Sequence, residues 1–211
     1  MSQQLVLALA STIRHDGNGG VADDLADVGG LATWLREQAE PLREYAAEPL
    51  RFTSESESES DTATPDEQLR LDVVALRHAV RTLFARAVRP GPPSRADAST
   101  LLPVPDAVDQ LNRAAGQLPV RPVLSWPDEA TPTVSWHGEA ADARRRLTAG
   151  LARAAIEFLA SPARDQLLAC PAPRCVRYFV KDHPRQEWCK PSCGNRARVS
   201  RHYQRHAANR S

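Results

Sequence analysis

The sequence has little lysine, no long apolar run and no cysteine before Cys170. Two lysines stand beside 25 arginines, and together with abundant alanine this indicates a GC-rich bacterial genome. No stretch approaches the roughly 20 consecutive apolar residues of a transmembrane helix, and the first residues lack the features of a secretory signal. We therefore expect a cytoplasmic protein without membrane contact, in a compartment where disulfides do not persist.

The formal net charge of +1 hides an uneven distribution along the chain. Residues 1–69 carry 14 acidic and 4 basic side chains, a net charge of −10. Residues 70–169 carry 10 acidic and 13 basic side chains, a net charge of +3. Residues 170–211 carry 2 acidic and 10 basic side chains, a net charge of +8. A basic end behind an acidic front suggests that the C-terminal part faces nucleic acid.

All four cysteines lie in the basic part, as two close pairs. The spacing is Cys170-x4-Cys175-x13-Cys189-x3-Cys193. Each pair can occupy a tight turn, and four thiolates satisfy one tetrahedral Zn²⁺ without leaving an open position. Neither pair has the C-x-x-C spacing of redox motifs. The sequence therefore predicts a structural zinc site, against the alternative of four ordinary buried thiols.

The segments around the cysteines predict a treble-clef-like finger. Residues 176–182 are rich in aromatic and β-branched side chains. With residues 186–188, which follow a proline-containing turn, they are expected to form a β-hairpin between the two cysteine pairs. The residues after Cys193 predict a helix whose start carries the last zinc ligand.

Basic residues fall on one side of that helix when they are placed on a 100° wheel. No acidic residue follows Glu187, so this basic face can contact phosphates. Val199 and Tyr203 fall on the opposite side with Arg196, which is expected to bond a cysteine turn or to stack on Trp188. The candidate DNA-binding residues are Arg185 in the hairpin loop and Arg198, Arg201, His202 and Arg205 on the helix.

The segment of about residues 165–206 resembles the CGNR zinc finger family. The resemblance is carried by the cysteine spacing, by Phe179-x-x-Asp182, by Trp188 before the second pair, by Cys193-Gly194-Asn195-Arg196, and by the basic residues with Tyr203. Family members commonly have a basic pair before the tryptophan, where this chain has Gln186 and Glu187. We expect Trp188, Asn195 and Arg196 to support the finger structurally.

In the CGNR family the finger follows an N-terminal domain named ABATE, which is described as a stress-induced transcription regulator. The resemblance therefore implies a bacterial DNA-binding regulator.

Residues 1–160 predict a mostly helical domain with a small antiparallel sheet. Residues 5–13 fit a strand or a buried segment. Apolar periodicity predicts helices over residues 31–48, 65–89, 105–116 and 139–160. Residues 120–126 and 131–136 predict a β-hairpin in which Trp126 and Trp136 pair across the strands or line a ligand pocket.

The helix predicted over residues 65–89 has a clear start signal, with Thr64 as N-cap and Glu67 completing a capping box. Apolar residues line one face of this helix. We expect its arginines to lie mostly on the solvent side; they are Arg70, Arg77, Arg81 and Arg89.

Residues 54–61 alternate serine with acidic side chains and contain nothing that could be buried. We therefore expect disorder over about residues 53–63. The simplest interpretation is a solvated linker. An alternative is an acidic decoy that folds back on the basic finger and competes with DNA.

The expected fold class is α+β, with a mostly helical regulatory domain over residues 1–160 and the zinc finger over residues 165–211. The leading hypothesis is a zinc-dependent, DNA-binding transcription regulator of a bacterium. Its first domain would sense a small-molecule effector or assemble as a homodimer. The main alternative is a finger that binds protein instead of DNA.

An enzymatic alternative is a zinc-stapled nuclease. It would use Asp182 and His183 with His202 or His206 around a second divalent ion. The sequence argues against it, because the Asp-His pair lies at a turn and arginines crowd the helix. We therefore expect no enzymatic activity.

Overall fold

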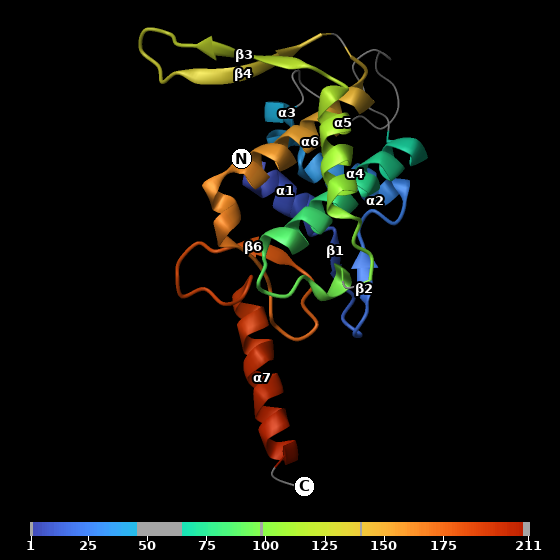
Figure 1. The fold of residues 1–211 in the computed structure, drawn as a ribbon, viewed down its shortest axis with the longest axis vertical. Coiled ribbons are helices and arrows are strands. Elements are labelled where there is room, and N and C mark those ends of the chain that lie inside the picture. Colours follow the sequence, from blue (N-terminus) through green and yellow to red (C-terminus); the bar gives the residue numbers. More distant parts are fainter. Residues whose placement is uncertain (1, 46–64, 98, 140, 209–211) are drawn as a thin grey trace.

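The computed structural model describes residues 2–45, 65–97, 99–139 and 141–208 (Figure 1). This part of the chain is mostly helical, and its strands form separate two-stranded antiparallel sheets. The α+β fold class is confirmed. Thr64 and the predicted acidic loop at residues 53–63, with its linker and decoy interpretations, lie outside the described residues.

The helices that precede the cysteine-containing part form one packed unit. They are α1 (Ser2–Ala10), α2 (Val28–Glu37), α3 (Ala39–Tyr45), α4 (Glu67–Ala87), α5 (Val104–Gly116) and α6 (Ala143–Ala160). Two strand pairs belong to the same part of the chain: β1 (Ile13–His15) with β2 (Val21–Asp23), and β3 (Val120–Ser125) with β4 (Thr133–Gly138). A 3₁₀ helix, Pro162–Gln166, leads to β5 (Leu167–Ala169), β6 (Tyr178–Val180) and α7 (Pro191–Ala208).

Helix α1 is part of the hydrophobic core, where it packs against α4 and α6. Leu5 and Leu9, one helical turn apart, are both buried. The expectation of a buried segment is confirmed, but the strand alternative is wrong. Leucine and alanine favour a helix, whereas the β-branched Ile13 beyond them begins β1.

The helix boundaries differ from the predicted ones for local reasons. The side chain of Asp66, the residue before α4, accepts a hydrogen bond from the Leu69 amide at 2.7 Å, so Asp66 caps this helix. The helix predicted over residues 31–48 is divided into α2 and α3. Pro41 lies in the first turn of α3, where a proline removes no helical hydrogen bond.

Two arginines of α4 that were expected to face solvent are buried instead. Arg77 and Arg81 are only 1% and 3% exposed. The Arg77 guanidinium donates to both carboxylate oxygens of Asp23, at 2.5 and 2.7 Å. The Arg81 guanidinium donates to Asp97 at 2.7 and 3.1 Å. Apolar periodicity mispredicts the burial of these two arginines, because it does not show the buried acceptors that distant segments of the chain supply.

Arg81 belongs to a buried polar cluster that reaches the cysteine-containing part. Its Nη2 donates to the carbonyl of Val176 at 3.3 Å, and the Ser94 hydroxyl donates to the same carbonyl at 2.8 Å. The Tyr178 hydroxyl donates to Asp97 at 2.6 Å. We call Arg81, Ser94, Asp97, Val176 and Tyr178 the buried junction. It attaches the cysteine-containing part firmly to α4.

The buried junction also fixes the protonation of its tyrosine. Burial raises the pKa of the Tyr178 hydroxyl, and the neighbouring carboxylate of Asp97 raises it further. Tyr178 therefore stays protonated and remains the donor to that carboxylate.

The β3–β4 hairpin and α7 extend from opposite ends of the molecule (Figure 1). Trp136 pairs with Pro122, and Trp126 lies beyond the end of β3. The predicted cross-strand pairing of Trp126 with Trp136 is therefore wrong, because β3 ends at Ser125.

Removing one partner of the buried junction is expected to destabilise the fold strongly. Replacement of Asp97 by alanine leaves Arg81 charged and buried, which lowers the free energy of unfolding by about 3–5 kcal/mol. Urea unfolding followed by circular dichroism measures this change. The control is Asp165→Ala, which removes an exposed ion pair with Arg164 and is expected to lower stability by less than about 1 kcal/mol. Equal losses in the two variants would contradict the assigned role of the junction.

Candidate metal centre and nucleic-acid interface

The four cysteines lie together in space. Their sulfur atoms are all within 4.8 Å of one another. The Cys175 and Cys189 sulfurs are 3.7 Å apart, and those of Cys189 and Cys193 are 3.6 Å apart. Four sulfurs bonded at about 2.3 Å to a tetrahedral metal ion lie roughly 3.8 Å from their neighbours. The four cysteines are therefore positioned to bind one metal ion.

Tight turns hold each cysteine pair in place. In the first pair, the Cys175 amide donates to the Ala172 carbonyl at 3.0 Å, and Arg174 adopts a left-handed φ of 63°. In the second pair, the Cys193 amide donates to the Lys190 carbonyl at 3.0 Å as α7 begins. The prediction that the last cysteine lies at the start of a helix is confirmed.

The cluster favours ionisation of one thiol. Hydrogen bonds from Cys170 and Cys189 lower the pKa of the Cys175 thiol from 9.0 to about 2. Metals bind the thiolate form, and the same contacts raise the pKa of the Cys170 and Cys189 thiols, so Cys175 ionises before these two.

A small apolar core surrounds the sulfur atoms. Ala172 and Phe179 are buried with the cysteines, and Trp188 packs against this group. The Trp188 ring also lies on Gly194, where an added Cβ would come within 3.1 Å of a ring carbon. This close approach explains why a glycine follows the last cysteine. So few apolar residues rarely stabilise a fold without a metal ion.

The strand in the finger pairs differently from the expectation. Residues 178–180 form β6, but the partner is β5, which precedes the first cysteine. The predicted return strand at residues 186–188 is absent from the structure of this segment. Leu167 and Leu168 provide the apolar strand that pairs with β6, and their position before the first cysteine hid this role in the sequence.

Two residues of the CGNR tetrapeptide contact the metal centre or its helix. The guanidinium of Arg196 donates to the Cys193 sulfur at 3.5 Å, rather than to a turn carbonyl or the Trp188 ring. Asn195 is exposed and accepts a hydrogen bond from Arg198 through its side-chain oxygen. Asn195 therefore positions an arginine of the exposed helix face.

Helix α7 presents the predicted basic residues to solvent. Arg198, Arg201, His202 and Arg205 are all exposed, and α7 extends away from the helical unit (Figure 1). Val199 and Tyr203, which fall on the opposite side of the helix from the basic residues, are exposed as well. After the first two turns of α7, none of the described residues forms a core against which the helix could pack.

The remaining DNA-binding candidate lies in the loop between β6 and α7. Arg185 is exposed there. The loop lines an open cavity of about 420 Å³ beside the metal centre, and Asp182 and Glu187 line it together with Arg185. This surface carries both signs of charge, unlike α7.

The nuclease alternative requires a second cluster of metal ligands. Asp182, His183 and His202 are exposed, and the side chain of His206 lies outside the described residues. Within the described part of the chain, the four cysteines are the one group of three or more potential ligands that could share a metal ion.

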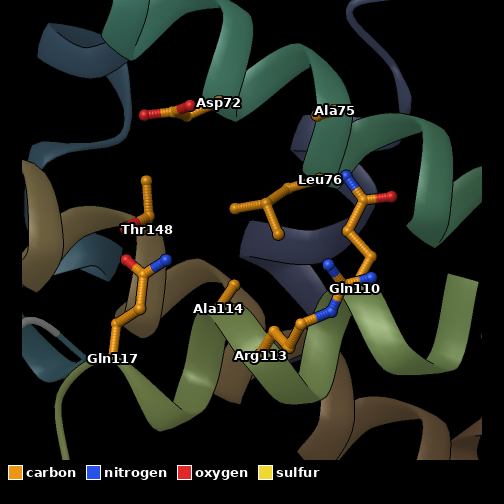
Figure 2. Close-up of a pocket in the computed structure, with 8 residues that line it drawn as sticks. All are labelled: Asp72, Ala75, Leu76, Gln110, Arg113, Ala114, Gln117 and Thr148. Atoms are coloured by element: carbon orange, nitrogen blue, oxygen red, sulfur yellow. The ribbon is translucent and has the colours of Figure 1, made fainter.

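The helical unit contains a separate small cavity of about 190 Å³ between α4, α5 and α6. Figure 2 shows Asp72, Thr148 and Gln117 on one side of Leu76, and Gln110 and Arg113 on the other. The cavity thus combines an apolar wall with groups of both charges.

None of the helices in the described ranges is long and apolar enough to span a membrane.

Two family descriptions match the chain. The ABATE family, described as "Putative stress-induced transcription regulator", matches residues 3–162. The CGNR zinc finger family matches residues 166–206. The resemblance stated from the sequence is thereby confirmed, and both matches are regulatory or zinc-finger families rather than enzymes. A comparison with curated proteins finds no match.

Loss of one thiolate is expected to abolish metal binding. The purified chain should contain about one zinc ion, and Cys193→Ser should retain only a small fraction of it after dialysis. Mass spectrometry of the metal content measures this difference. Ser192→Ala, an exposed change one residue earlier, is the control and should keep the full zinc content. Full zinc occupancy in the Cys193 variant would refute the assignment.

Proposed function

The chain belongs to the ABATE family, and from this premise we propose that it is a bacterial transcription regulator whose zinc finger binds DNA. Residues 165–211 form the DNA-binding part, held by Zn²⁺ on Cys170, Cys175, Cys189 and Cys193. Residues 1–160 form the regulatory part. The proposal gives the protein no enzymatic activity.

The observation that carries this proposal is the exposed basic face of α7. Arg198, Arg201 and Arg205 recur at helical spacing and are all exposed. Residues 188–211 contain no acidic side chain. Each arginine that contacts a phosphate releases a condensed counterion and adds salt-dependent affinity. His202 lies beside this face, and Arg185 is a secondary contact from the loop.

The four-cysteine site supports the same proposal through the geometry of α7. Cys193 lies within the first turn of the helix, so zinc would fix the helix start to the rest of the finger. Arg198 is further oriented by its hydrogen bond to Asn195. A fixed helix loses less conformational entropy when it binds a phosphate backbone.

For the regulatory part, we place effector binding in the small cavity between α4, α5 and α6. Its carboxylate, guanidinium and amide groups suit a small molecule that carries both charges. Asp72 and Leu76 of this cavity share α4 with Arg81 of the buried junction. A ligand that shifted α4 would therefore act on the segment that holds the finger.

A protein partner remains the second candidate, because the same arginines could bind an acidic protein surface. The DNA hypothesis is preferred because three arginines recur on one helix side with no acidic residue in the segment, and the exposed Val199 and Tyr203 lie on the other side of the helix. A tight protein interface typically centres on buried aromatic or apolar residues.

Removal of the basic face should weaken DNA binding and its salt dependence together. The triple variant Arg198→Ala, Arg201→Ala and Arg205→Ala should lower the slope of log K against log salt concentration by about 0.9 for each lost phosphate contact. Fluorescence anisotropy with a labelled duplex over a range of salt concentrations measures both quantities.

The matched control replaces three exposed arginines of the helical unit by alanine; they are Arg36, Arg86 and Arg89. This variant should bind DNA like the wild type. Equal affinities of the two triple variants, or no duplex binding by the zinc-loaded wild type at low salt, would refute the proposal. Retention of an acidic protein partner in the latter case would favour the alternative.

A further inference from the structure

Arg174 occupies the turn of the first cysteine pair, beside the start of α7. It directly precedes Cys175, whose sulfur lies within 4.8 Å of the sulfur of Cys193 in the first turn of that helix. Its side chain is exposed, and its backbone has the left-handed φ of 63°. Glycine adopts this conformation freely, whereas a long side chain adopts it at an energetic cost. An arginine in place of glycine therefore indicates a use for the side chain.

The turn that carries Arg174 is rigid. Pro171 and Pro173 each fix a φ angle within it, and the Cys175 amide closes it on the Ala172 carbonyl. The backbone under Arg174 is thus ordered before any ligand binds. A contact made by this guanidinium loses little conformational entropy.

A second exposed arginine reaches the same place from the helical unit. Arg95 begins a 3₁₀ helix, Arg95–Asp97, directly after Ser94. The Ser94 hydroxyl donates to the carbonyl of Val176, two residues after Arg174, at 2.8 Å. Both arginines therefore lie within two residues of one hydrogen bond, at the base of α7. We call Arg95 and Arg174 the base arginines.

The charges of the base arginines are not neutralised by the protein. Within the described ranges, neither guanidinium takes part in an ion pair or a side-chain hydrogen bond. Asp97, two residues after Arg95, is buried and already accepts from Arg81 and Tyr178. Residues 166–181 contain no acidic side chain. The base of α7 is therefore available to an anionic partner.

We propose that Arg95 and Arg174 contact the phosphate backbone of the same duplex that contacts α7. This inference rests on the proposed DNA binding and adds to it a contact from the helical unit. The planar guanidinium matches the geometry of phosphate oxygens. Both parts of the chain would then hold one duplex, and a change at the buried junction would alter DNA affinity directly.

Distances along α7 allow these contacts to form together. Arg198 and Arg205 lie five and twelve residues after Cys193, which is about 8 and 18 Å along the helix axis. The major groove is about 12 Å wide and is bordered by phosphates. A duplex that contacts the arginines of α7 therefore has further phosphates within reach of the helix base.

Arg174→Gly tests the contact from the cysteine turn, because it removes the guanidinium and suits the left-handed backbone. Zinc content should be unchanged. Duplex affinity at about 0.1 M salt should fall roughly five- to tenfold, and the slope of log K against log salt should fall by about 0.9. Fluorescence anisotropy with the zinc-loaded full chain and mass spectrometry of its metal content measure these quantities.

The matched variant Arg174→Lys keeps the charge and should retain most of the affinity and of the salt slope. Zinc loss in Arg174→Gly would show that Arg174 balances the thiolate charge, and it would overturn the phosphate contact. Equal losses of affinity in the glycine and lysine variants would overturn it as well.

Arg95→Ala tests the contact from the helical unit. It should lower the affinity and the slope by similar amounts, and the double variant with Arg174→Gly should lower the slope by about twice as much. The control is Arg36→Ala, which removes an exposed arginine of α2 and should bind like the wild type. Identical binding by the Arg95 and Arg36 variants would overturn the contact from the helical unit.

These measurements separate the base arginines from the proposed function. Weakened binding by the triple variant of α7, with wild-type affinity in Arg174→Gly and Arg95→Ala, would leave the proposed function intact and overturn the base contacts. Absence of duplex binding by the zinc-loaded wild type would overturn both.

Discussion

The buried guanidinium of Arg81 is the interaction on which the arrangement of the whole chain depends. It bonds the carboxylate of Asp97, the last carbonyl of α1 at Ala10, and the carbonyl of Val176 in the finger. Each of its nitrogen atoms has an acceptor, which is the condition under which a buried charge is tolerated. Because these acceptors come from separate parts of the sequence, the charge is satisfied only when all of them are in place. The helical unit and the finger are therefore parts of one packed structure.

The finger contributes little apolar surface to this structure and depends on two other constraints. The four cysteines are positioned to bind a metal ion at one side of the segment, and Val176 with Tyr178 attaches its other side to Arg81 of α4, Ser94 and Asp97. Between them Phe179 and Trp188 form a core too small to fold alone. This segment is the base from which α7 extends, and the arginines of that helix are exposed.

The sequence predicted those features that depend on local spacing. The cysteine pairs, the helix after Cys193 and the α4 apolar face follow from short-range patterns, and the structure has each of them. It could not predict that Arg77 and Arg81 are buried, because their acceptors Asp23 and Asp97 are supplied by other segments. The pairing of β6 with β5 was missed for another reason, because β5 lies before the first cysteine, outside the segment between the two cysteine pairs. Periodicity reports which face of an element is apolar, but it carries no information on a distant polar partner.

The position of Val176 and Tyr178 in the sequence has a consequence for how the chain is made. The partners of these residues at Ser94 and Asp97 lie far earlier in the chain and leave the ribosome first. Synthesis proceeds from the N-terminus, and domains generally fold in that order. Arg81 and Asp97 are therefore synthesised before the finger residues Val176 and Tyr178 that complete their hydrogen bonds. We therefore expect the finger to dock last, because its attachment needs Arg81, Ser94 and Asp97 to be already in place.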